Sequence, residues 1–225
     1  MTEAEWLVAV NAQKMIAALS GKGSERLWRL FAVACCRRFE HRMRNPRSRR
    51  ALDVAEQFAD GLATVQELKA AHANAEQAAH EAFCDAHMDE VRANFQWDAG
   101  YEAMWAAKEA ADAAVQCVAE ELVTSTGGQT VVIAERLQFP DMLREVFGNP
   151  FRWTLINPNW IAWNDGAVRK IAQATYDERA FDRMPILADA LEDAGCGNAD
   201  ILRHCREPGE HVRGCWVIDL LLGKE

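Results

Sequence analysis

Two stretches bracket the C-terminal third of the chain: GNPFRWTLINPNWIAWNDG at 148–166 and GCGNADILRHCREPGEHVRGCWVIDLLLGKE at 195–225. The last apolar run, Cys215 to Leu222, is shorter than the roughly 18 residues of a membrane span and too apolar for a surface. We therefore expect a buried helix there; a strand is the alternative, because Val217 and Ile218 are β-branched. The run predicts a compact C-terminal helical module.

Cap signals divide the rest of this third into helices. The segment 149–158 reads as an ordered, extended linker with two prolines. Asn164 or Asp165 is expected to cap one helix, Asp182 the next, and Asn198 a short third one, because Asn and Asp side chains accept bonds from the first-turn N–H groups. Gly195 is expected to stop the second of these helices.

The N-terminal part of the chain is also divided into predicted helices by cap signals. Thr2 and Glu5 fit a capping box, which predicts a first helix to about Leu19. Ser24 is expected to cap a second helix, at 25–44, whose apolar residues recur on one face. Asn45 and Pro46 mark its end and the start of a third helix, which Gly61 terminates. Residues 129–147 are expected to form one or two short helices, with Pro140 marking the boundary.

The middle of the chain is rich in alanine. Thr64 and Glu67 form a second capping box, followed by a helix to about Asn94 with no Pro or Gly. A second long helix is predicted at 101–123. Small side chains let helices approach closely, so the two arms predict an antiparallel helical hairpin.

These patterns predict an all-α fold: a multi-helix bundle with a long Ala-rich antiparallel helical hairpin and a compact C-terminal helical module. The expected division is N-terminal helices at 1–62, the hairpin at 63–124, connecting helices at 125–147 and the Trp/Cys-rich module at 148–225; one continuous domain is the alternative. No apolar run is long enough to span a membrane. The acidic N-terminus and seven cysteines without a disulfide pattern favour a reducing cytoplasm.

Several motifs carry a resemblance. They include WRLFAVACCRR at 28–38, SRRALDVAEQFADGLAT at 48–64, FGNPFR at 147–152, NWIAWNDGAV at 159–168 and HVRGCWVIDLLLGKE at 211–225. With these motifs the chain resembles a family of uncharacterised proteins that is multiplied in planctomycete-type bacterial genomes. The resemblance covers both ends of the chain. It implies no particular activity and points to no enzyme family.

The clearest group of potential metal ligands lies near the C-terminus: Cys196, His204, Cys205, His211 and Cys215. Thiolates and imidazoles are the ligands that Zn²⁺ takes four at a time. A Zn²⁺ ion bound there would hold the loop around Pro208 in place. The sequence otherwise predicts no cofactor, and Zn²⁺ is the alternative. The opposing interpretation is that the cysteines are small buried apolar residues, because no CxxC pair is present and neighbouring residues face different sides of a helix.

Two other catalytic or metal arrangements are weaker. The same residues could supply a Cys–His nucleophile, with Arg203, Arg206 and Arg213 lowering the pKa of the thiol. On the long Ala-rich helix, steps of four residues place a strip of potential ligands on one side: His72, Glu76, His80 and Cys84, with His87 close by. The Glu-x-x-His pairing of di-metal bundles is absent, which favours a solvated outer face.

An arginine block marks the second and third helices. Residues 26–50 hold nine Arg and one Glu, and residues 51–138 hold four Lys or Arg against sixteen Asp or Glu. Arg37, Arg38 and Arg42 are therefore candidate binding residues for phosphates or carboxylates. The net charge of −9 favours carboxylates, within the chain or on a partner, and makes nucleic acid an unlikely ligand.

Trp153, Trp160 and Trp163 are candidates for a binding surface, where Trp is enriched, or for the core of the C-terminal module.

No complete catalytic motif is present, so the sequence favours a non-enzymatic interaction or adaptor protein with a protein partner or self-association. The alternatives are a metal- or thiol-dependent enzyme centred on residues 204–215 and a nucleic-acid binder using residues 37–50.

Overall fold

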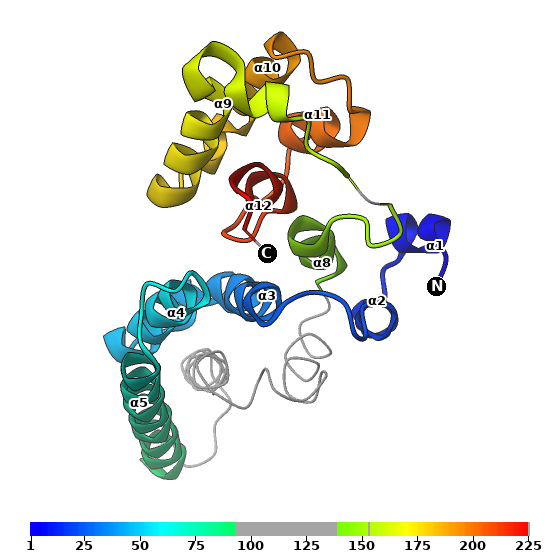
Figure 1. The fold of residues 1–225 in the computed structure, drawn as a ribbon. Helices are drawn as coiled ribbons and strands as arrows, with labels where there is room; N and C mark the ends of the chain where they lie inside the picture. Colours follow the sequence, from blue (N-terminus) through cyan, green and yellow to red (C-terminus); the bar gives the residue numbers. More distant parts are fainter. Residues whose placement is uncertain (93–138, 153, 225) are drawn as a thin grey trace. The chain divides into compact units, whose positions relative to one another are not determined.

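The computed structural model describes residues 1–92, 139–152 and 154–224, with the side chains of 82, 83 and 85–92 left aside. These ranges contain helices and no strand, which confirms the all-α prediction. The chain divides into two compact units, residues 1–9 with 141–225, and residues 10–140 (Figure 1). None of the described helices is long and apolar enough to cross a bilayer.

In the unit of residues 10–140, α4 (Pro46–Ala59) packs against both α3 (Glu25–Arg37) and α5 (Val65–Arg92), and α2 (Ala12–Ala18) precedes them. The predicted caps form. Ser24 accepts a hydrogen bond from the Leu27 N–H, and Thr64 and Glu67 form their capping box. Gly61 ends α4 at a φ of 71°, which a residue without Cβ adopts readily.

The N-terminal helix prediction was wrong in its length. The chain forms α1 (Glu3–Val8), with the expected capping box, and then breaks before α2. Ala9 is extended, and the Asn11 side chain accepts from the Lys14 N–H, so it starts a new helix. The break assigns α1 to the unit that contains residues 141–225 and α2 to the other unit.

The helix predicted at 25–44 ends early. α3 stops at Arg37, and a 3₁₀ turn, η1 (Glu40–Arg42), follows. Residue 45 precedes a proline, which disfavours a helical backbone. Asn45 is accordingly extended and its side chain caps α4.

The unit of residues 1–9 and 141–225 is called the C-terminal unit below. Besides α1 it contains α8 (Pro140–Phe147), α9 (Pro158–Glu178), η3 (Phe181–Arg183), α10 (Met184–Asp193), α11 (Ala199–Arg206) and α12 (Trp216–Leu222). α9 packs on α10 and α12, and α10 packs on α11. Buried side chains of α9 to α12 form one apolar cluster, whose members include Tyr176, Leu187, Ile201 and Ile218. The terminal apolar run is a buried helix, as the sequence predicts, and Asn198 caps α11.

Two caps in this unit were predicted wrongly. α9 consists of two helical segments joined by a kink; Asn157 caps the first, and the second is the helix expected after Asn164 or Asp165, but neither residue has the extended backbone of an N-cap. Both residues instead have positive φ in a kink that ends at Gly166. Asp182 lies in η3, and α10 starts with Pro185 in its first turn and without a side-chain cap, because proline has no N–H that needs a partner.

The first arm of the predicted hairpin is α5, and the second arm at 101–123 lies outside the described residues. The hairpin itself therefore stays a prediction, as does the division into four segments.

Arg37 links α3 to α4. Its guanidinium lies 2.6 Å from Asp53, 3.3 Å from Glu56 and 3.0 Å from Glu40. Arg26 likewise pairs with Asp60, and Arg47 with Glu81. The intramolecular carboxylates expected for the arginine block are present at these three positions. Because Glu56 is only 4% exposed, removing the Arg37 guanidinium costs more than breaking a surface ion pair, since it leaves a buried carboxylate without that partner.

Replacing Arg37 should therefore destabilise the protein. Arg37→Met is expected to lower the free energy of unfolding by about 2–3 kcal/mol, because it removes the guanidinium beside a buried carboxylate. Arg49→Met, at an exposed position of α4, should change it by less than about 0.5 kcal/mol. Urea unfolding followed by circular dichroism measures both; equal losses would contradict a buried network.

Candidate metal centre

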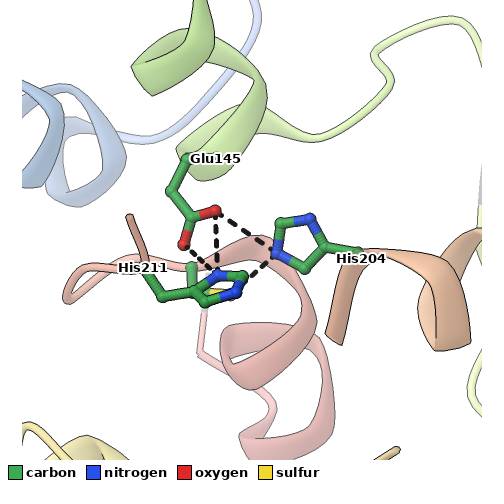
Figure 2. Close-up of side chains that lie close together, drawn as sticks. Glu145, His204 and His211 are labelled. Atoms are coloured by element: carbon green, nitrogen blue, oxygen red, sulfur yellow. Dashed lines mark hydrogen bonds and ion pairs between the residues drawn. The ribbon is translucent and has the colours of Figure 1, made fainter. Parts of the chain in front are cut away.

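Four side chains from four segments meet in the C-terminal unit. Glu145 lies on α8, His204 on α11, His211 on the loop between α11 and α12, and Cys215 at the N-cap position of α12. One ligand atom from each lies within 4.8 Å of all the others. Figure 2 shows the Glu145 carboxylate facing both imidazole rings.

The distances converge on a small volume. Nδ1 of His211 lies 3.2 Å from each carboxylate oxygen of Glu145. Nε2 of His204 lies 3.3 Å from Oε2 of Glu145 and 3.2 Å from Sγ of Cys215. The Val212 N–H donates to Oε1 of Glu145 at 3.3 Å, which fixes the carboxylate against the loop.

This spacing matches a tetrahedral ion. Zn–N, Zn–O and Zn–S bonds of about 2.0–2.3 Å place neighbouring ligand atoms about 3.3–3.7 Å apart. The distances from His204 to Glu145 and Cys215 and from His211 to Glu145 are within a few tenths of an ångström of that range, and all pairs are within 4.8 Å. The donor set of two imidazoles, one thiol and one carboxylate suits Zn²⁺ rather than Mg²⁺ or Ca²⁺, which take oxygen ligands.

The cluster is buried. The side chains of Glu145 and His211 are 7% and 8% exposed, that of His204 is 18% exposed, and Cys215 is fully buried. Burial lowers the pKa of His204 to about 4, although the charge of Glu145 opposes this shift. Burial also raises the pKa of the Cys215 thiol well above its usual value, and the Glu145 carboxylate adds to the effect.

The geometry differs from that of a nucleophilic triad. In a Cys–His–acid triad the thiol contacts one ring nitrogen and the acid contacts the other. Here the Cys215 sulfur and the Glu145 carboxylate both approach Nε2 of His204. A reactive cysteine also needs access and a lowered pKa, whereas Cys215 is buried and its pKa is raised. Two groups that converge on one nitrogen are better explained by a shared cation.

Three of the five predicted metal residues come together: His204, His211 and Cys215. Cys196 and Cys205 are buried in the apolar cluster and are not members of this group, as expected for small apolar side chains. Cys205 follows His204 on a helix and therefore faces another side. Burial raises the pKa of Cys205 to about 12.

Sequence reasoning missed Glu145, which is distant in the chain. One signal was present: α8 buries Met142, Leu143 and Val146, and Glu145 lies within the same apolar stripe. A carboxylate on the buried side of an amphipathic helix needs a partner, because isolated buried charge is costly.

The other candidate residues have packing or pairing roles. Trp160 and Trp163 are half-buried against the apolar cluster, and Trp153 lies outside the described residues. The guanidinium of Arg38 lies 4.3 Å from the ring centroid of Phe139, and that of Arg42 lies 5.4 Å from that of Phe39. Each is a cation–π contact within the unit of residues 10–140.

The strip on α5 forms two local pairs. His72 lies 3.7 Å from Glu76, and Nε2 of His80 lies 3.6 Å from Sγ of Cys84. Within the described residues, the strip contributes to no cluster of three or more ligands. His87 has no described side chain.

Comparison of the chain with protein-family models, curated proteins and solved structures gives no significant match. A function for the chain must therefore be inferred from the geometry of the cluster itself.

Burial predicts a difference in thiol reactivity. In the folded protein, iodoacetamide should alkylate the exposed Cys84 and leave Cys215 unmodified, because alkylation requires an accessible thiolate. Peptide mass spectrometry after a short pulse distinguishes the two positions. Alkylation of Cys215 at the rate of Cys84 would support a reactive thiol instead.

The lowered pKa of His204 predicts an acid-sensitive fold. The unfolded chain, with a His pKa near 6.5, binds a proton that the folded protein binds only near pH 4, so stability should fall as the pH drops through this window. The full loss is on the order of 3 kcal/mol for the metal-free protein. Unfolding in chelator at several pH values should show a smaller loss for His204→Gln; equal pH dependence would contradict the assignment.

Proposed function

We propose that this protein is a metal-binding protein that holds one Zn²⁺ ion between Glu145, His204, His211 and Cys215. The observation that carries the proposal is the convergence of four ligand atoms within 4.8 Å inside a buried part of the C-terminal unit. The Glu145 carboxylate and the Cys215 thiol both lie near Nε2 of His204, where a divalent cation would attract all three groups.

Charge balance supports the same assignment. A Glu145 carboxylate and a Cys215 thiolate supply two negative charges, and the two neutral imidazoles add none, so a divalent cation gives a neutral site. Without a cation, burial and then the charge of Glu145 raise the pKa of Cys215 and favour its neutral thiol. A bound metal reverses this effect, because coordinating thiols lose their proton.

The proposed site is structural rather than catalytic. Catalytic zinc sites keep one position open for water or substrate, whereas structural sites use four protein ligands. All four ligands here come from the chain, and the thiol is fully buried. The site therefore supports a non-enzymatic role, such as an adaptor that binds a protein partner or itself, over a metal- or thiol-dependent enzyme.

A reducing compartment such as the cytoplasm fits this proposal. The free thiols include Cys35, Cys36, Cys84, Cys196, Cys205 and Cys215, and oxidation of Cys215 would remove a ligand.

A nucleic-acid role has less support, since Arg37 already engages three carboxylates.

Metal binding can be measured directly. Protein purified without chelator should contain one Zn²⁺ per chain by elemental analysis, and Co²⁺ added to the metal-free form should give a thiolate-to-metal charge-transfer band. Cys215→Ser should abolish that band, and loss of any one ligand should weaken binding at least about tenfold.

Two neighbouring cysteines provide matched controls. Cys196→Ala and Cys205→Ala remove thiols that lie close in sequence but outside the four-residue group, so they should keep one equivalent of metal and the cobalt band. A metal-free wild type, or a band that depends on Cys205 rather than Cys215, would overturn the proposed site.

A further inference from the structure

The candidate metal centre joins two parts of the C-terminal unit. Three of its ligands belong to the segment 204–215, which is continuous with the apolar cluster formed by α9 to α12. Its fourth ligand, Glu145, lies on α8. The described members of this cluster come from residues 156–222.

Close contacts join α8 to these later segments. The Glu145 carboxylate reaches His204, His211 and the Val212 N–H. At the end of α8, Gly148 has a φ of 58°, and a Cβ built there would lie 3.0 Å from Cγ of Trp216. The Trp216 ring in turn lies 5.2 Å from the His204 ring, centroid to centroid. The α8 terminus therefore fits against α12 beside the metal ligands.

On its other side, the same segment holds the N-terminal helix (Figure 1). The Arg144 guanidinium, next to Glu145, donates to the carbonyls of Trp6 and Ala9 at the end of α1. The buried Trp6 indole donates to the Gly148 carbonyl at 3.0 Å. A third link joins Glu3 to the Asn149 amide at 2.7 Å.

We propose that metal occupancy controls the docking of α8 and α1 onto the C-terminal helices. The inference rests on the proposed function. Glu145 can coordinate the ion only when α8 is docked, so Zn²⁺ binds the docked state more tightly and shifts the population toward it. Adjacent positions on α8 then transmit the effect, because Glu145 binds the metal and Arg144 binds α1.

Reciprocity follows from linkage. If Zn²⁺ favours docking, then docking favours Zn²⁺ by the same factor, and a change that releases α8 weakens the metal site. The N-terminal residues 1–9 are thereby a sensor of metal occupancy, although none of them contributes a ligand to the described cluster.

Hydrogen exchange followed by mass spectrometry tests this coupling. The full chain is compared in chelator and with free Zn²⁺ at about 100 times its Kd. Amides of α1 and α8 that exchange through undocking should slow, approaching about 100-fold where the ion binds only the docked state. If Zn²⁺ binds with one equivalent and neither helix changes, the inference is overturned and the proposed function stands. If Zn²⁺ does not bind, the proposed function itself fails.

Two variants separate the effect of Zn²⁺ on the docking of α8 from its effect on the docking of α1. Arg144→Met keeps every ligand, so it should bind one Zn²⁺ and keep the slowing in α8 but lose it in α1. Glu145→Gln should weaken binding and, when saturated with Zn²⁺, show little slowing in either helix. Arg169→Met, at an exposed position of α9, is the matched control and should behave as the wild type. Equal slowing of α1 in Arg144→Met would overturn the role assigned to Arg144.

Discussion

The buried carboxylate of Glu145 is the interaction on which the C-terminal unit depends. A charge with 7% exposure must be compensated, and here the partners are two imidazoles and one backbone N–H, with the Cys215 thiol within 4.8 Å. These partners come from α11, the following loop and the start of α12. The requirement to compensate one charge thus fixes the position of α8 relative to three later segments.

The same helix explains why residues from both ends of the chain share one unit. α1 is only six residues long and would be unstable alone in water. It is held because Trp6 is buried and Arg144 binds its terminal carbonyls. Neighbouring residues on α8 thus serve two purposes, with Arg144 directed to the N-terminus and Glu145 to the ligand cluster.

Local signals in the sequence were reliable where the physics is local. Thr2, Ser24, Thr64 and Asn198 cap helices as predicted, because the donor and acceptor lie within one turn of chain. The same reasoning failed at Asp182 and Asn164, where Pro185 begins one helix without a cap and a left-handed turn lies inside another. Residues with cap-forming side chains are not caps wherever they occur; the surrounding packing selects among them.

The sequence by itself determined the helical class and many helix boundaries, and it placed His204, His211 and Cys215 among five candidate ligands, because these properties depend on short-range periodicity and spacing. Only the tertiary structure added Glu145, which lies 59 residues before His204 in a different helix, and left Cys196 and Cys205 outside the group of candidate ligands. Coordination requires atoms to converge on one point in space. Spacing along the chain constrains that convergence within one turn or loop, and the packing of distant helices decides the rest.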